Sequence, residues 1–242
     1  MVISCARQPL APPSLCLDGV ALRWTSSAKL LGVTLDAQLR FSAHVGEVQL
    51  QRKKTVLSRA RRQLGFCLRV TKGAGPETLR HLFTALVLPQ LEYCCPIWSP
   101  HQEHLVAALE SVQRRAAYAT LVRRRDTRIA RYREMRTADL LQAVGWNPLA
   151  LRREVASLRL LTNLLILNSN QSGVVLPLRK NRTGSLQPIL ARTERHRQSF
   201  VVRTVTHWRS LPPSFTLCPP TARDEVKDFC HRVTSHLRHS LT

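Results

Sequence analysis

The spacing of apolar residues changes near Ser42, and this change constrains the fold more than any other feature of the sequence. From Ser42 onward, apolar side chains recur every three or four positions, as on one face of an α-helix. The first such run comprises Val45, Val48, Val56, Ala60 and Leu64. We expect Ser42 to cap this helix at its N-terminus, and Gly65 to end or bend it.

Similar spacing predicts helices further along the chain. Pro76 suits the first turn of a helix over about 77–88, and residues 91–98 are expected to connect it to the next one. Later helices are predicted over about 101–121, 137–144, 148–168 and 221–239, with a surface loop near 168–193. Aromatic residues make up 5% of the chain, so the core must consist mainly of Leu, Val and Ala; the tryptophans expected to anchor it are Trp98, Trp146 and Trp208.

The first forty residues favour strands instead. Asp18-Gly19 lies between the runs 14–17 and 20–24, and this dipeptide is a strong signal for a two-residue hairpin turn. Residues 1–4 and 29–35 form further short β-type runs. The predicted fold class is therefore α+β, mainly α-helical, with a small antiparallel β segment at the N-terminus. We divide the chain into a β-rich region (1–41), a basic helical region (42–135) and a helical C-terminal region (136–242).

The chain carries a formal net charge of +22, and most of its 37 basic residues are arginines. An enzyme acting on a neutral metabolite does not need such a field, so a polyanionic partner is the first inference. Arginine grips phosphate oxygens through a planar fork of donors, which favours nucleic acid, whether RNA, DNA or a hybrid. Codon bias in a GC-rich gene is an alternative cause of the arginine excess.

Two groups of basic residues are predicted to contact phosphates without reading bases. The first lies on the helix expected after Ser42, where positions 52, 59 and 62 fall on one side, and comprises Arg52, Lys53, Lys54, Arg59, Arg61 and Arg62. The second comprises Arg114, Arg115, Arg123, Arg124, Arg125 and Arg128. The alternative for both groups is a solvated charged face. Phosphate binding is favoured, because the chain has only 15 acidic residues to pair with them.

Other classes of protein and site find little support. No apolar run is long enough to span a membrane, and no secretory leader is expected, because Arg7 and Pro9 interrupt the N-terminus. The seven cysteines have no regular spacing, which favours reduced thiols in an intracellular protein of the nucleus or cytoplasm. A zinc site is an alternative near the C-terminus, but the spacing there fits no common zinc finger; the residues concerned are Cys218, Cys230, His231, His236 and His239. No metal or cofactor is expected.

Side chains that could serve as catalysts have simpler interpretations. Glu103, Glu110 and Glu134 lie among arginines and are expected to be charge partners. The cysteine pair Cys94-Cys95 has an apolar neighbourhood, which favours packed thiols over nucleophiles.

Several sequence blocks, taken in order, are similar to those of one family. The blocks are Leu30–Asp36, His81–Tyr93, Trp98–Pro100, Leu109–Ala116, Leu140–Trp146 and Arg195–Leu211. Together they resemble the C-terminal part of the reverse transcriptases of non-LTR (LINE-type) retrotransposons, most nearly the chicken-repeat-1 and Jockey-like groups. The resemblance extends over nearly the whole chain.

The resemblance implies a role for each region. Residues 1–41 would be a remnant of the palm, 42–135 a thumb-like region that holds the template–primer duplex, and 136–242 the C-terminal region. Leu31, Gly32 and Val33 would correspond to the hairpin that helps to place the primer end. The polymerases of this family hold two metal ions with an adjacent Asp-Asp pair, whereas all six aspartates of this chain are isolated. The resemblance therefore implies a fragment without catalytic activity that begins after the catalytic residues.

The leading hypothesis is thus a non-catalytic fragment of an RNA-directed DNA polymerase that binds template–primer through phosphate contacts. One alternative is a retrotransposon-derived relic, or a gene-model fragment, with no selected activity. Another is the thumb subunit of a split polymerase, completed by a separate palm and fingers fragment.

Overall fold

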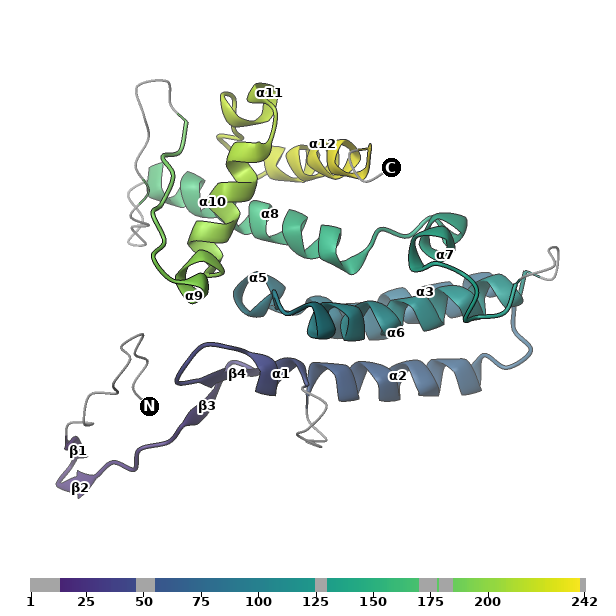
Figure 1. The fold of residues 1–242 in the computed structure, drawn as a ribbon, viewed down its shortest axis with the longest axis horizontal. Coiled ribbons are helices and arrows are strands. Elements are labelled where there is room, and N and C mark those ends of the chain that lie inside the picture. Colours follow the sequence, from purple (N-terminus) through teal and green to yellow (C-terminus); the bar gives the residue numbers. More distant parts are fainter. Residues whose placement is uncertain (1–13, 47–54, 125–129, 170–177, 179–184, 240–242) are drawn as a thin grey trace.

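The computed structural model describes residues 14–46, 55–124, 130–169, 178 and 185–239. Its fold is α+β and mainly helical, as predicted, with two small β-hairpins at the N-terminus followed by a body of helices (Figure 1). No helix among the described residues is long and apolar enough to cross a membrane.

The first hairpin confirms the prediction from Asp18-Gly19. Strands β1 (Cys16–Leu17) and β2 (Val20–Ala21) pair in antiparallel fashion, with Leu17 opposite Val20. Both turn residues have positive φ, 50° at Asp18 and 78° at Gly19, as a type I′ turn requires. The β-type run expected at residues 1–4 lies outside the described residues.

The second hairpin corrects the prediction of one strand over 29–35. The chain turns back at Leu31-Gly32, both with positive φ, so that β3 (Ser27–Leu30) pairs with β4 (Val33–Asp36). Glycine at the second turn position takes this conformation without steric cost, which lets a short β-type run fold on itself. The two hairpins form separate two-stranded sheets.

The helix expected from Ser42 to Leu64 is two helices. Helix α1 (Ser42–Val45) follows Phe41, not Ser42, as its N-cap residue, and it ends at Gly46, whose φ of 119° is left-handed. Helix α2 (Val56–Val70) begins after Thr55, which forms a capping box with Ser58. Gly65 neither ends nor bends α2, because one glycine costs only about 1 kcal/mol in a helix that is held by packing.

The next helical segment contains a π-helical turn. It runs through α3 (Pro76–Leu82), η1 (Phe83–Val87) and α4 (Leu88–Glu92), with Pro76 in the first turn as predicted. Pro89 has no N–H to donate to the preceding turn, and the chain widens just before it, where Leu88 N–H donates to the Phe83 carbonyl. The expected connector at 91–98 contains a short helix, α5 (Cys95–Trp98).

The remaining helices follow the predicted order. They are α6 (Glu103–Val122), α7 (Thr137–Val144), α8 (Leu149–Ser169), α9 (Glu194–Arg197), α10 (Phe200–Ser210), α11 (Pro213–Thr216) and α12 (Glu225–His239). Helix α7 has the predicted bounds. Helix α12 begins four residues later than predicted, because Thr221 N–H donates to the Glu225 carboxylate instead of opening the helix.

Among the described residues, buried apolar side chains form three clusters. The largest joins α2, α5 and α6 to the segment α3–α4 and surrounds Trp98. The second joins α8, α10 and α12 around Trp208, and the third lies between α6 and α7. Trp98 and Trp208 are therefore core residues, as expected, whereas Trp146 is only half-buried and stacks on Phe83. Leu186, in the expected surface loop, is buried in the second cluster because its apolar side chain reaches Trp208 and its neighbours.

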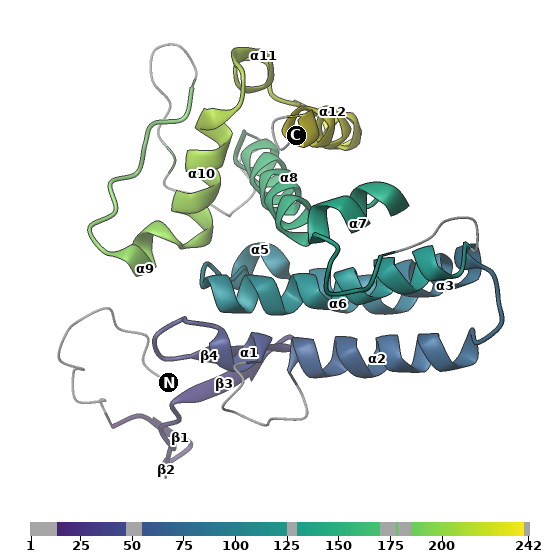
Figure 2. The ribbon, with the colours of Figure 1, turned by 45° about the vertical axis from the view of Figure 1, so that its right-hand side comes forward.

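The helices lie in layers (Figures 1 and 2). Helix α2 forms one outer face, α3 and α6 lie next to it, and α7 and α8 lie on the far side of α3 and α6. Arg203 links α10 to α5 and to the residue that follows α5. Its Nη2 donates to the Pro96 carbonyl at 2.8 Å, and its Nη1 donates to the carbonyls of Gln198 at 3.0 Å and Ser99 at 3.4 Å.

Candidate nucleic-acid interface

Helix α2 presents a basic face to solvent. Its fifteen residues include four arginines and no acidic residue. Arg59, Arg62 and Arg69 lie within about 80° of one another around the helix axis, because successive residues are rotated by about 100°. All three are exposed, whereas Ala60 and Leu64 on the opposite side are buried. The arginines therefore project away from the core.

An exposed aromatic ring lies among these arginines. Phe66 falls between Arg59 and Arg62 in angle around α2, and 47% of its surface is exposed. We call the set Arg59, Arg62, Phe66 and Arg69 the α2 face. Phosphates would meet the guanidinium groups, and an unpaired base could stack on the ring. Phe66 and Arg69 are not among the residues predicted above, although the spacing of the four residues by three, four and three positions is present in the sequence.

Packing and capping hold the α2 face in a fixed orientation. The Thr55 hydroxyl accepts from Ser58 N–H at 3.2 Å, and the Ser58 hydroxyl accepts from Thr55 N–H at 3.1 Å. The buried side of the helix packs against α6 and α4 in the largest core cluster. Both ribbon views show α2 at the edge of the molecule, with no helix covering its outer side (Figures 1 and 2).

The predicted phosphate-binding residues separate into three sets. Arg52, Lys53, Lys54, Arg125 and Arg128 lie outside the described residues. The predicted single helix from Ser42 through Arg59 is wrong at Thr55, which is extended at the N-cap of α2. Arg59, Arg61, Arg62 and Arg115 are exposed, with Arg61 to one side of the α2 face and Arg115 on α6.

The third set, Arg114, Arg123 and Arg124, binds carbonyl or hydroxyl groups of the protein. Arg123 at the end of α6 donates to the Thr71 hydroxyl at 2.7 Å and the Leu68 carbonyl at 3.4 Å, which ties it to the end of α2. Arg124 donates to the Ala143 carbonyl at 2.9 Å. At these three positions the guanidinium groups hold the tertiary structure together, and their predicted contact with phosphates stays a prediction.

Arg114 is the strongest of these structural contacts. Its Nη2 donates to the carbonyls of Tyr132 and Met135, both at 2.8 Å, and its guanidinium carbon lies 4.4 Å from the centre of the Tyr132 ring. It holds the segment before α7 against α6.

Arg114 and Arg115 should respond differently to replacement by alanine. Arg114→Ala should lower the free energy of unfolding by about 2 kcal/mol, because two charge-assisted hydrogen bonds are lost. Arg115→Ala at the adjacent exposed position should change it by less than about 0.5 kcal/mol. Urea unfolding followed by circular dichroism measures both values. Equal effects would contradict a structural role for Arg114.

The tip of the second hairpin docks on the helical body. Leu31 is 83% exposed, but its carbonyl accepts from the Tyr93 hydroxyl at 2.8 Å. Gly32 lies against the same ring, where a Cβ would approach it to 3.4 Å, and Val33 is buried. Leu31, Gly32 and Val33 thus form a fixed and partly exposed turn, and the primer-placing role that the resemblance implies for them stays a prediction.

Behind this turn, His44 lies between the hairpin and the core. Its Nδ1 accepts from Thr34 N–H at 3.2 Å, and its ring meets the Trp98 ring edge-on at 5.5 Å. Burial, and then the nearby charges of Arg59 and Lys29, lower the pKa of His44 from 6.5 to about 4. The imidazole is therefore neutral near pH 7.

The candidate catalytic groups have structural roles. Glu110 accepts from Ala150 N–H at 2.8 Å at the start of α8, and Glu134 accepts from Arg131 N–H at 3.2 Å. Cys95 is buried, as expected for a packed thiol, and burial raises its pKa to about 12.

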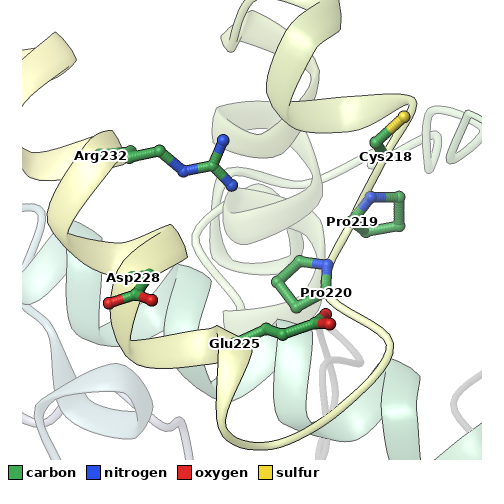
Figure 3. Close-up of a pocket in the computed structure, with 6 residues that line it drawn as sticks. All are labelled: Cys218, Pro219, Pro220, Glu225, Asp228 and Arg232. Atoms are coloured by element: carbon green, nitrogen blue, oxygen red, sulfur yellow. The ribbon is translucent and has the colours of Figure 1, made fainter.

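The residues considered for zinc do not gather into a metal site. In the part of the chain that the structure describes, no three His, Cys, Asp or Glu side chains lie close enough together to hold an ion. Cys218 instead lines a shallow pocket of about 360 Å³ beside α12, with Glu225, Asp228 and Arg232 (Figure 3). The Arg232 guanidinium extends toward Cys218, while the Asp228 carboxylate points away. Backbone N–H groups, first that of Thr221, lower the pKa of Glu225, so its carboxylate serves the start of α12.

No protein-family model, curated protein or solved structure matches the chain. The resemblance to reverse transcriptases therefore rests on the sequence blocks, and the geometry of the α2 face is an independent observation.

Proposed function

We propose that the chain binds nucleic acid without sequence preference through the α2 face. The observation that carries this proposal is the gathering of Arg59, Arg62 and Arg69 on one exposed helix side that lacks carboxylates. Such a face suits the evenly spaced charges of a sugar–phosphate backbone. It has no set of polar groups arranged to read base edges, so affinity should depend on charge and salt more than on sequence.

The resemblance gives this binding a context. We propose that the chain corresponds to the thumb and C-terminal region of a LINE-type reverse transcriptase and holds a template–primer duplex without copying it. One feature supports the proposal: the exposed arginines of α2 lie in the region that the resemblance assigns to the thumb. The hairpin tip at Leu31-Gly32 would then lie toward the primer end. A primer-extension assay with the chain alone should give no product.

Removing the α2 arginines should weaken binding and flatten its salt dependence. The triple variant Arg59→Ala, Arg62→Ala and Arg69→Ala should bind a duplex about tenfold to a hundredfold less tightly at low salt. The slope of log K against log salt should fall by about 2 to 3, since each lost phosphate contact on B-form DNA removes about 0.9. Alanine favours helix, so α2 should remain folded. Fluorescence anisotropy with a labelled duplex at several salt concentrations measures both quantities.

A matched control separates contact from overall charge. Arg133, Arg209 and Arg223 are exposed and lie outside α2, so replacing all three with alanine removes the same charge elsewhere. This control should change the salt slope by less than 1. Equal losses of affinity in the two triple variants would show that binding depends on net charge and would refute the role of the α2 face. Failure of the unmodified chain to bind a duplex at low salt would also refute it.

A further inference from the structure

A second candidate site lies on the other side of the α3–α6 layer from the α2 face. It is a cavity of about 360 Å³ between α3, η1, α6 and the loop that joins α7 to α8. This volume is within the range of sites for small organic ligands, about 300 to 1,000 Å³. In both ribbon views α3 and α6 lie between α2 and helices α7 and α8 (Figures 1 and 2), and the loop that joins α7 to α8 lines the cavity.

The cavity wall includes the one irregular turn of the α3–α4 segment. Phe83 and Thr84 of the π turn line the cavity, together with Leu88 at its end. Proline at position 89 accounts for the loss of α-helical bonding, and π turns inside helices often occur at functional sites. The wider turn places Phe83 where Trp146 stacks on it, with ring centres 4.7 Å apart and planes 13° from parallel.

Gln113 contributes a hydrogen-bond acceptor without a partner. Its Nε2 donates to the Asn147 carbonyl at 3.0 Å, and a carbonyl oxygen can only accept, so the orientation of the side-chain amide is fixed. The other amide atom, Oε1, is buried and has no hydrogen-bond partner among the described residues. Leaving such an oxygen unpaired is costly. Gln113 lines the cavity, and a ligand N–H donor that enters beside it and reaches Oε1 would remove this cost.

The charge of the cavity favours an anion. Arg80, His81 and Arg152 line it, and its described lining residues include no carboxylate. Arg152 is already bound in bidentate fashion by Glu92, with Nη2 to Oε2 at 3.1 Å. Arg80 is half-buried and makes no side-chain hydrogen bond within the described residues, so its guanidinium is available for a ligand.

From these features we propose that the cavity binds a nucleotide whose base carries an exocyclic amino group, such as an adenine nucleotide. The amino group donates to Gln113 Oε1, the flat base packs against Trp146, and the phosphate binds Arg80. The nucleotide is either free in solution or an unstacked residue of a bound strand. The site is separate from the α2 face and does not depend on it.

Three ligands test the proposal on the full chain by isothermal titration calorimetry. AMP should bind about tenfold more tightly than purine riboside 5′-monophosphate, which lacks only the amino group, because Gln113 Oε1 then stays unpaired. Ribose 5-phosphate, without a base to pack on Trp146, should bind more weakly still. No binding of AMP at millimolar concentration, or equal binding of AMP and the purine riboside nucleotide, would overturn the proposal.

Variants connect the binding to named atoms. Arg80→Ala should weaken AMP binding about tenfold, since one charge-assisted phosphate contact is lost, while Arg59→Ala on the α2 face should leave it unchanged. Gln113→Leu should abolish the preference for AMP, and Gln142→Leu at an exposed position of α7 should preserve it. Arg80 lies at the protein surface, so its variant tests the site even if Gln113→Leu fails to fold. Loss of AMP binding in Arg59→Ala but not in Arg80→Ala would place the nucleotide on α2 and refute the assignment.

A last measurement identifies the source of the nucleotide. A single strand with one 2-aminopurine presents a fluorescent base with an amino group. A fluorescence change on binding that excess AMP reverses would identify an unstacked base of the strand as the occupant; AMP binding without such a change would identify the free nucleotide. If the α2 triple variant loses duplex binding and still binds AMP, the two sites are independent.

Discussion

Replacing Trp98 with alanine should lower the free energy of unfolding by about 3 to 5 kcal/mol, the usual cost of removing a buried tryptophan. Trp98 is fully buried in the largest core cluster. Its indole N–H donates to the Tyr93 carbonyl at 2.6 Å, and its ring meets His44. The substitution would therefore leave both a cavity and an unpaired carbonyl next to the docked hairpin.

Trp24 provides the matched control, because 37% of its surface is exposed and it lies outside all three core clusters. Trp24→Ala should cost less than about 1 kcal/mol. Chemical denaturation of both variants, followed by far-UV circular dichroism, gives the two values. A cost below 1 kcal/mol for Trp98→Ala would show that α5 does not anchor the core.

Acidification should destabilise the protein through His44 by about 3 kcal/mol between pH 7 and pH 4. The unfolded chain protonates this imidazole near pH 6.5, while the folded chain resists protonation until about pH 4. The unfolded state therefore binds more protons between these values, and stability falls as the pH falls through them. Above pH 6.5 the imidazole is neutral in both states, so His44 contributes no pH dependence there.

His44→Gln isolates this contribution, because glutamine stays neutral and its side-chain oxygen can accept from Thr34 N–H. The measured quantity is the difference between the two proteins, because contributions common to both cancel in it. The free energy of unfolding should depend more steeply on pH in the unmodified chain from pH 6.5 to pH 4. Parallel pH profiles would show that His44 is not held neutral in the folded state.

Local signals were sufficient where one short segment determines its own structure. Asp18-Gly19 predicted the first hairpin because a type I′ turn depends on two adjacent residues, and the bounds of α7 followed from the apolar spacing within it. The division between α1 and α2 was missed. It depends on Gly46, whose left-handed conformation leaves no room for a side chain: an added Cβ would lie 2.8 Å from the Thr55 hydroxyl. That contact arises only after the chain has turned.

The candidate interface shows the same limit. The sequence predicted phosphate contacts at Arg59 and Arg62, and both are exposed because they lie opposite the apolar side of one helix. It could not distinguish Arg114 from Arg115, since the carbonyls that Arg114 binds come from residues 132 and 135. Gln113 and Trp146 were equally hidden as partners in a cavity, because they meet only when the loop after α7 reaches α6.

The three carbonyls that accept hydrogen bonds from Arg203 couple two of the core clusters. Pro96 lies in α5 and Ser99 directly follows it, beside the largest core cluster. Arg203 belongs to α10, which packs in the second cluster. Moving α10 away from α5 would expose this half-buried guanidinium to solvent and leave the carbonyls of Pro96 and Ser99 without their donor. We therefore expect calorimetry to record a single heat-absorption peak in which the largest and the second core clusters unfold together. Arg203→Met should split this peak into two.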